Sequence, residues 1–303
     1  MKVVLAGGSG FIGSNLATHF TDKNDEVVVL TRGKSRKENG IEFIHWDAKH
    51  FDDWCSSLES CDVLINLTGK SVDCRYTEDN KAEIINSRVD ATNILGAFLA
   101  LMDNPPKVWI NLSTATIYRH SEDKIMDEIN GEVGNDFSMN VAQKWEEALN
   151  KPKLTDTRRI ALRVSLVIGK GGGVYPVLKR LAKFGLAGTM GNGKQRFAWI
   201  HISDCIRLIE FIITNENIKG PVNCTAPSNP TNKEFMKTLR KSLGIPIGLP
   251  QPKFLIKFGA MLMRTESELI LKSRWVKPQK LLDEGFEFQF KTAKVALDNL
   301  AED

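Results

Sequence analysis

The chain has 303 residues, of which 42% are hydrophobic and 26% are charged, so it can bury an ordinary core in one large or two closely packed domains. Its 41 basic and 37 acidic residues give a net charge of +4, and the scattered basic residues argue against a nucleic-acid-binding surface. No apolar run approaches the roughly 20 residues that span a bilayer, and the five cysteines share no C-x-x-C spacing. We therefore expect a cytoplasmic protein with reduced thiols, and neither nucleic acid nor membrane as a partner.

Short strand-like runs alternate with longer helical patterns over the first 170 residues. The expected strands are apolar and rich in β-branched residues, and they lie at 2–6, 26–30, 41–46, 62–68, 107–113 and 157–169. Helical patterns lie at 11–20, 78–102 and 136 to about 150. Continuous apolar strands separated by helices indicate a parallel sheet covered on both faces. The sequence therefore predicts an α/β fold with a Rossmann-type doubly wound parallel sheet.

The composition changes after Gly169, where glycine and turn signals become frequent. Helical patterns follow at 203–215 and 232–244, with a strand-like run at 220–226 between them. The apolar stretch "FLIKFGAMLM" at 254–263 predicts a helix that covers a core, and an interaction surface is the alternative. We expect two domains, a dinucleotide-binding domain at 1–169 and, mostly at 170–303, a smaller C-terminal substrate lobe that closes over the carboxyl edge of the sheet. Whether later segments return to the sheet is left open.

A glycine-rich turn follows the first predicted strand. The run "VVLAGGSGFIGSNL" places Gly7, Gly10 and Gly13 in a G-x-x-G-x-x-G pattern between a strand and a helix. Such a turn lets the backbone approach a pyrophosphate, whose charge then lies at the N-terminus of the helix. Because the strand before the turn and the helix after it are both in place, the pattern predicts dinucleotide binding rather than a purely structural turn.

The end of the second predicted strand bears on which dinucleotide is bound. NAD-binding folds usually carry Asp or Glu there, about 20 residues past the loop, to accept a hydrogen bond from the ribose 2′-hydroxyl. Here the strand ends in "VVVLTR", which places Thr31 and Arg32 at that position with further basic residues behind them. A guanidinium beside a hydroxyl suits a 2′-phosphate through charge-assisted hydrogen bonds. The sequence favours NADP(H) as cofactor, and the alternative is a solvated basic loop.

Several segments together resemble the extended short-chain dehydrogenase/reductase superfamily, in its epimerase-like branch. They are "GGSGFIG", "LINLTG", "SRVDATNIL", "LSTATIY" and "WIHISD". More narrowly, "KWEEAL", "LRVSLVIGKGGG", "GNGKQRFAWIHISD" and "KPQKLLDEGFEF" are similar to the atypical members labelled epimerase family protein, which end in a small C-terminal domain of unassigned function. The similarity runs from Met1 to about Leu297, and it is specific for fold and family rather than for substrate.

The resemblance implies a set of cofactor contacts along the carboxyl edge of the sheet. The glycine loop would hold the pyrophosphate, through Gly7, Ser9, Gly10, Phe11, Ile12 and Gly13. The other implied contacts are Thr31 and Arg32 at the 2′-phosphate, Trp46 and Asp47 at the adenine, Leu67, Thr68 and Gly69 on the ribose side, Arg88 in the same groove and Val167 at the nicotinamide end. For Arg88, a surface ion pair is the alternative.

The catalytic set that the resemblance implies is incomplete. In the superfamily a Ser or Thr orients the carbonyl, a Tyr transfers a proton to the reacting oxygen, and a Lys four residues later lowers the pKa of that Tyr. Thr114, beside Ser113 at the end of a predicted strand, falls at the hydroxyl position. If Glu146 is the glutamate that usually follows the lysine by four, the tyrosine position is Ser138 and the lysine position is Ala142. Both catalytic side chains are therefore missing.

Few other residues can take over the proton transfer. Lys144 lies two residues past the lysine position, rotated by about 200° around the helix, so it cannot substitute without a change of register. Tyr118 follows the strand-end hydroxyl by four and is a candidate acid, although the superfamily commonly has a wall residue there. Tyr175 and Lys179 spell Y-x-x-x-K by coincidence, after the expected sheet, and Tyr76 is more simply a packed or solvated ring.

Two hypotheses follow for the function. The first is an NADP(H)-dependent oxidoreductase or epimerase with a non-standard acid, acting on a small carbonyl or hydroxyl compound such as a nucleotide-linked sugar, with Arg196 and Trp199 as candidates for substrate contact. Its candidate catalytic residues are Ser113, Thr114, Tyr118 and Lys144. The second is a catalytically silent NADP(H)-binding protein that senses redox state or binds a partner. The sequence shows no pattern of metal ligands, and it does not specify the substrate, the reaction direction or the oligomeric state.

Overall fold

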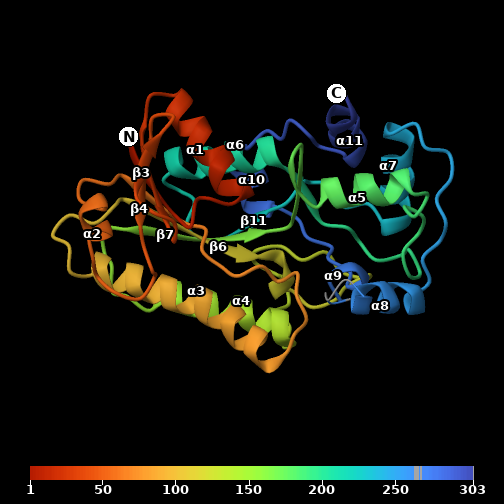
Figure 1. Ribbon diagram of the computed structural model, residues 1–303, viewed down its shortest axis with the longest axis horizontal. Coiled ribbons are helices and arrows are strands. Elements are labelled where there is room, and N and C mark those ends of the chain that lie inside the picture. The colour runs from red at the N-terminus through yellow and green to blue at the C-terminus, as the bar shows by residue number, and fades with distance from the viewer. Residues whose placement is uncertain (263–265, 267, 303) are drawn as a thin grey trace.

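The computed structural model of the protein describes residues 1–262, 266 and 268–302, and its larger part is an eight-stranded sheet with helices on both faces (Figure 1). The strands run in the order β11-β7-β6-β5-β1-β2-β4-β3, and all pair in parallel except the edge strand β3. Their bounds are β1 Lys2–Ala6, β2 Glu26–Thr31, β3 Arg36–Glu38, β4 Ile41–His45, β5 Val63–Asn66, β6 Val108–Thr114, β7 Arg158–Val164 and β11 Gly220–Cys224. Because the order steps outward from β1 in both directions, the predicted doubly wound sheet is confirmed.

The helices divide between the two faces of this sheet, with α1, α6 and α10 on one side and α3 and α4 on the other (Figure 1). Their bounds, with two short elements, are α1 Phe11–Asp22, α2 Trp54–Ser57, α3 Glu78–Leu99, η1 Ala115–Ile117, α4 Phe137–Asn150, α6 Ile202–Thr214 and α10 Gln279–Asp283. Successive strand residues point to opposite faces, so Val3 and Leu5 join one hydrophobic core and Val4 joins the other. The sheet is buried on both sides, as its near-continuous apolar strands require.

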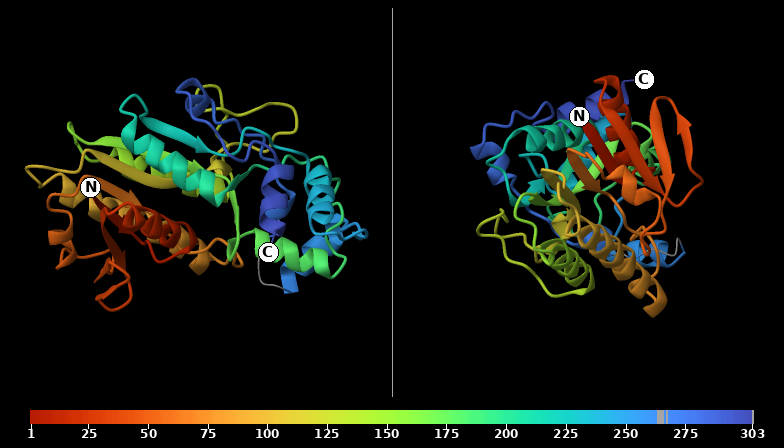
Figure 2. Two further views of the ribbon diagram at one scale, coloured as in Figure 1. Left: turned by 90° about the horizontal axis from the view of Figure 1, so that it is seen from above. Right: turned by 90° about the vertical axis from the view of Figure 1, so that its left-hand side faces the viewer.

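A smaller lobe stands at one end of the molecule, where α5, α7, α8 and α11 gather (Figures 1 and 2). It contains a three-stranded sheet in the order β10-β8-β9 and has its own hydrophobic core. Its elements are β8 Leu166–Gly169, β9 Gly172–Gly173, α5 Tyr175–Lys183, β10 Trp199–His201, α7 Asn232–Ser242, α8 Lys253–Leu262, α9 Glu268–Leu271 and α11 Ala293–Ala301.

The run 157–169, expected to be one strand, is divided between the two sheets. β7 ends at Val164 and β8 begins at Leu166. Between them the backbone N–H and the Oγ of Ser165 both donate to the carbonyl of Cys224, at 3.0 and 2.9 Å. These bonds fasten the turn to β11, which lies beside β7 in the larger sheet. The chain thus returns to the larger sheet after it has built part of the smaller lobe.

The apolar stretch 254–263 falls on α8, except for Met263, which lies outside the described residues. Ile256 and Ala260 are buried, whereas Phe254 and Phe258 are exposed. The helix therefore covers the core of the smaller lobe with one side only. Among the helices of the described part of the chain, none combines the length and the apolar character needed to cross a membrane.

Candidate functional site

The glycine loop between β1 and α1 leaves a helix N-terminus without an acceptor. Gly7 has a φ of +72°, in the left-handed region that favours glycine. Gly10 is the N-cap of α1 and provides no side-chain cap, so the first N–H groups of the helix are open to a ligand. A Cβ on Gly13 would run into the backbone of Gly8, whereas one on Gly10 would meet nothing within 4 Å. Gly13 thus serves packing, and Gly10 borders open space where an anion is favoured.

The carboxyl end of β2 offers a hydroxyl and a free guanidinium. Thr31 is buried, and its Oγ1 accepts a hydrogen bond from the N–H of Gly33 at 3.2 Å. Arg32 is exposed, and no other described residue forms an ion pair or a hydrogen bond with its side chain. Arg36, in the same basic run, is by contrast engaged, because its Nε lies 3.1 Å from Glu38 Oε2. Arg32 is therefore available to an incoming anion.

The carboxyl end of β5 lies beside a partly buried arginine. Thr68 Oγ1 is buried and has no hydrogen-bond partner among the described residues. The guanidinium of Arg88 donates to the carbonyls of Ile84 at 2.8 Å and Lys70 at 3.0 Å, and its Cζ would lie 3.0 Å from a Cβ on Gly69. Burial lowers the pKa of Arg88 to about 10. The edge of a dinucleotide site fits this combination of an orphaned hydroxyl, a bare glycine and an arginine without a described carboxylate partner. Arg88 does not form the surface ion pair that was the alternative for it.

At the predicted adenine position, the structure corrects the expectation for one side chain. Trp46 is only 2% exposed, and its indole packs against Trp54 in the core at a centroid distance of 5.8 Å, so it cannot offer its ring to a ligand. The exposed Asp47 carboxylate accepts from the His50 ring at 2.6 Å and from the backbone N–H groups of His50 and Lys49. These hydrogen bonds lower the pKa of Asp47 to about 2. Asp47 as an adenine contact stays a prediction.

Four predicted contacts are partly buried side chains that pack against the core on the α1 side of the sheet. They are Phe11, Ile12, Leu67 and Val167. The Phe11 ring fills the space over Gly172, where a Cβ would clash with it. The N-terminus of α1 therefore touches the β8–β9 hairpin, which begins the smaller lobe. Ser9 is exposed at the tip of the loop.

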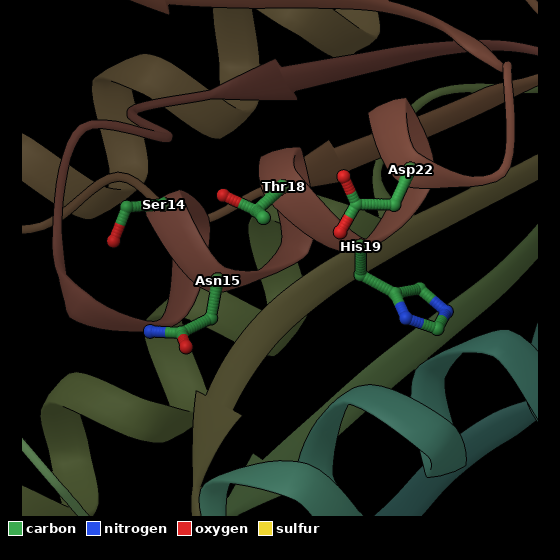
Figure 3. A pocket seen from close by; sticks show the side chains of 5 residues that line it. All are labelled: Ser14, Asn15, Thr18, His19 and Asp22. Atoms are coloured by element: carbon green, nitrogen blue, oxygen red, sulfur yellow. The ribbon is translucent and has the colours of Figure 1, made fainter.

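A shallow depression of about 360 Å³ lies along α1 (Figure 3). Its lining side chains follow one side of the helix, and they are Ser14, Asn15, Thr18, His19 and Asp22. At its far end His19 Nε2 lies 3.0 Å from Glu210 Oε2 of α6. The depression begins after the first three residues of α1 and runs away from the glycine loop, so we do not assign it to the dinucleotide site.

Thr114 keeps a hydroxyl at the carboxyl end of β6. Its Oγ1 accepts a hydrogen bond from the N–H of Thr116 at 3.1 Å and lies 2.9 Å from the hydroxyl oxygen of Thr116. Thr114 therefore caps η1. Ser113 is buried, and its Oγ donates to Glu146 Oε1 at 2.7 Å. Because Ser113 is committed to α4, Thr114 is the better placed of the two hydroxyls.

The structure corrects the expectation that Tyr118 is an acid. Tyr118 is 1% exposed, and its phenol oxygen lies 3.0 Å from the Asp127 carbonyl and 2.9 Å from Asn223 Oδ1. The same oxygen accepts a hydrogen bond from Arg163 Nη1 at 2.8 Å, and burial raises the pKa of Tyr118. Arg163 in turn binds both carboxylate oxygens of Glu146, at 2.9 and 2.8 Å. Tyr118 is thus part of a buried network that ties the sheet to α4.

The positions of the missing pair hold residues with structural contacts. Ser138 Oγ donates to Glu268 Oε1 of α9 at 2.7 Å, and Ala142 is buried. Lys144 is exposed and lines a shallow groove on the outer surface of α3 and α4, together with Val89 of α3. Its amine therefore lies away from the sheet edge, as the helical period predicts. No group of three or more His, Cys, Asp or Glu side chains in the described part of the chain could hold a metal ion.

Sequence reasoning missed the return of the segment 273–277 to the junction of the two lobes. Its residues bond to both lobes: the N–H of Met126 donates to the Trp275 carbonyl at 2.8 Å, and the N–H of Arg196 donates to Ser273 Oγ at 2.8 Å. No local pattern marks such a segment. Of the two predicted substrate contacts, Arg196 lies at this junction, whereas Trp199 is fully buried in the smaller lobe.

Arg163 was also missed, although the sequence holds a signal for it. It stands within the apolar run "IALRVSLV". An arginine in the interior of a buried strand requires a carboxylate partner, since arginine is almost never fully buried unless paired. Glu146 is that partner.

The doubly wound sheet and its glycine loop define a Rossmann-type dinucleotide-binding protein. Residues 3–224 match the family described as the NAD dependent epimerase/dehydratase family, and residues 251–300 match a domain of unknown function, DUF1731. The chain belongs to this epimerase family, and the resemblance seen in the sequence is confirmed.

Similar proteins cover the chain from end to end. The epimerase family protein SDR39U1 of Homo sapiens is 31% identical over 99% of both chains, and YfhF of Bacillus subtilis is 30% identical over 100% of this chain and 99% of its own. A crystal structure of the human protein (isoform 2) with NADPH has a TM-score of 0.89 and covers 100% of this chain and 99% of that one, at 30% identity. MoeE5 in complex with UDP-glucuronic acid and NAD, at 18% identity and a TM-score of 0.78 over 100% and 98% of the two chains, shares the fold.

Proposed function

We propose that the chain binds NADP(H) and uses it in the oxidation, reduction or epimerisation of a small molecule held between the two lobes. The end of β2 carries the proposal. Thr31 and Arg32, whose side chain has no partner among the described residues, stand where NAD-binding folds usually have an acid. The NADPH in the crystal structure of the human relative supports the same choice. Five free cysteines and the scattered charge support a cytoplasmic protein with a small-molecule substrate rather than nucleic acid or membrane.

Different groups of the chain would bind different parts of the coenzyme. The first N–H groups of α1 would hold the pyrophosphate, Arg32 the 2′-phosphate, and the edge formed by Thr68 and Arg88 the ribose side. When bound, the nicotinamide gives or takes a hydride. Thr114 is placed to hydrogen-bond a carbonyl or hydroxyl of the substrate at the end of β6. With Tyr118 committed to the buried network, the general acid stays unassigned.

A second candidate function is a catalytically silent NADP(H)-binding protein that senses redox state or binds a partner. One observation favours it: the tyrosine and lysine positions hold Ser138, bonded to Glu268, and the buried Ala142. The hydroxyl retained at Thr114 favours the enzyme, because a silent protein does not need it at the sheet edge.

The coenzyme is tested by titrating the cofactor-free protein with NADPH and with NADH, with fluorescence as the readout. We expect wild type to prefer NADPH, and Arg32→Asp to weaken NADPH binding by about 10–100-fold, the scale of hydrogen bonds to charged groups. Lys37→Asp, an exposed change of equal charge nearby, is the matched control and should have a small effect. Equal affinity for NADH, or an unchanged Arg32→Asp, contradicts the NADP(H) assignment. Binding of neither coenzyme removes the proposed function.

NADPH oxidation over a panel of small carbonyl compounds then separates the two candidates. Turnover that Thr114→Val abolishes supports the enzyme and its site. Wild-type turnover in Thr114→Val contradicts that site. Tight NADPH binding with no hydride transfer to any compound supports the silent protein.

A further inference from the structure

The helix α8, along an outer edge of the smaller lobe, presents an apolar stripe to solvent (Figure 1). Phe254, Phe258 and Met261 lie at the spacing i, i+4 and i+7, so they follow one side of the helix. Their side chains are 68%, 59% and 54% exposed. Ile256 and Ala260, on another side of α8, are buried. The core of the smaller lobe uses that other side, and the apolar stripe is left without a partner in the described part of the chain.

Two lysines form a second stripe on α8. Lys253 and Lys257 each precede one of the phenylalanines, and both are exposed and lie four residues apart. Successive helix residues are rotated by about 100°, so the lysines follow one edge of the apolar stripe. Neither ammonium group has an ion pair or a hydrogen bond with another described residue. Both charges are therefore available to carboxylates.

More exposed apolar side chains lie next to the start of α8. Ile247 and Leu249 belong to the segment that leads into the helix, and both are exposed. The N–H of Leu249 donates to the carbonyl of Gly185 at 2.8 Å, which brings the exposed Phe184 to the same region. We call these three side chains, together with the two stripes of α8, the Phe-Lys patch.

The charge around the Phe-Lys patch is of one sign. The segments 174–193 and 235–262, which include α5, α8 and most of α7, hold eight lysines and arginines and no Asp or Glu. The two segments adjoin, because the N–H of Gln251 donates to the carbonyl of Thr189 at 2.8 Å. Glu268, which follows α8, is already held by Lys272 at 2.6 Å. Although the basic residues of the whole chain are scattered, this region therefore has a local excess of positive charge.

The two stripes indicate the kind of partner that fits. An exposed apolar patch with a charged border marks a contact with another macromolecule, and Phe and Met are enriched at such contacts. Positive charge selects a negative partner. The stripes run side by side along one axis, as apolar and acidic stripes do on an amphipathic helix. A bilayer instead places its charged groups in a layer above its apolar interior.

We propose that the Phe-Lys patch binds an acidic amphipathic helix of a partner protein. Apolar residues of that helix, spaced i, i+4 and i+7, would pack on Phe254, Phe258 and Met261. Its Asp or Glu residues beside them would pair with Lys253 and Lys257. The patch contains none of the groups proposed for the coenzyme, so the smaller lobe would recruit a partner separately from coenzyme binding.

The test measures binding of the full chain to fluorescein-labelled peptides of about 20 residues by fluorescence anisotropy. The first peptide consists of Leu, Ala and Glu and forms an amphipathic helix with a Glu stripe beside a Leu stripe. The second has Lys in place of Glu, and the third has the composition of the first in scrambled order. We expect wild type to bind the Glu peptide at least about tenfold more tightly than either of the others.

Reversal of charge tests the lysine stripe. Lys253→Glu combined with Lys257→Glu should weaken binding of the Glu peptide by about tenfold or more and should strengthen binding of the Lys peptide. The control reverses two exposed lysines of the larger domain, Lys107→Glu with Lys153→Glu, and should leave both affinities unchanged. An equal loss in the control overturns the proposal, because attraction to the net charge of the protein would then explain the binding.

Removal of the rings tests the apolar stripe. Phe254→Ala combined with Phe258→Ala should weaken binding of the Glu peptide by about tenfold or more. Leu101→Ala, which truncates an equally exposed apolar side chain after α3, should have no effect. Thermal unfolding verifies the fold of each variant, and Phe258→Ala alone replaces the double variant if that one unfolds early. An unchanged affinity without the rings overturns the proposal.

Two other anionic partners are tested with the same variants. They are vesicles of phosphatidylcholine with phosphatidylglycerol, measured by sedimentation, and a labelled thymidine oligonucleotide. If vesicles or oligonucleotide bind through the patch and the Glu peptide does not, the proposal is overturned and the patch belongs to a lipid surface or a nucleic acid. Failure of wild type to bind the Glu peptide, or equal binding of the scrambled peptide, overturns it as well.

Discussion

The two halves of the carboxyl edge of one sheet are built in different ways. At β1, β2 and β5 the groups without a partner among the described residues are the N-terminus of α1, the buried Thr68 hydroxyl and the side chain of Arg32. At β6 and α4 most polar side chains bind one another, in the network of Tyr118, Arg163 and Glu146. A coenzyme site needs polar groups that have no protein partner. Where the usual catalytic acid is absent, the neighbouring side chains can form structural contacts with one another instead. Substitutions in these two halves distinguish residues that stabilise the fold from residues that bind the coenzyme.

The largest effect is expected from breaking the network at α4. Glu146→Gln removes the counter-charge of Arg163 and leaves that guanidinium buried and unpaired. We expect the free energy of unfolding to fall by about 3 kcal/mol, the lower end of the range for breaking a buried pair. Urea denaturation measures it, with the exposed neighbour Glu147→Gln as control and an expected change below about 0.5 kcal/mol. If the free energy of unfolding falls by the same small amount in both variants, the network is not what holds α4 to the sheet.

The glycine loop offers a pair of substitutions that separates packing from binding. Gly13→Ala places a Cβ against the Gly8 backbone and should destabilise the fold by about 1–3 kcal/mol. Gly10→Ala meets open space, so stability should change by less than about 0.5 kcal/mol, whereas NADPH binding should weaken because the methyl group fills the anion's place. Denaturation and NADPH titration of both variants decide this. Full NADPH affinity in Gly10→Ala would mean that the phosphates lie elsewhere.

The smallest effect is a dependence of stability on pH that comes from the N-terminus of α6. His201 is buried, its Nδ1 accepts from the N–H of Ser203 at 3.2 Å, and burial lowers its pKa to about 4. Between pH 6.5 and 4 the unfolded chain takes up a proton that the folded chain refuses, so stability falls as the pH falls. At pH 5.5 the loss should be about 1 kcal/mol relative to pH 7.5.

His201→Asn keeps a capping acceptor but cannot titrate, so it should remove this loss. Denaturation at the two pH values measures it, with the exposed His45→Asn as the control that leaves the loss in place. An identical pH dependence in His201→Asn and wild type would assign the effect to other groups.

The sheet and the dinucleotide loop were predictable because their signals are local. Strand and helix periods, the spacing of Gly7, Gly10 and Gly13 and the basic end of β2 are all read within a few neighbouring residues. The family resemblance placed Trp46 among the adenine contacts, and nothing near it in the sequence tells which face of the sheet edge its ring will join.

Contacts between distant parts of the chain decided the rest. Tyr118 qualified as an acid by its spacing, and only its bond to Asn223, 105 residues away, shows that its phenol is committed to the interior. Ser138 bonds Glu268 across 130 residues, and Arg274 reaches the junction only because the chain returns there after building the smaller lobe. By itself the sequence determined the fold, the family and the coenzyme loop, because backbone conformation and periodicity depend on near neighbours. Only the tertiary structure decided which polar side chains are consumed by one another and which are left for a ligand, because hydrogen-bond partners are chosen by packing.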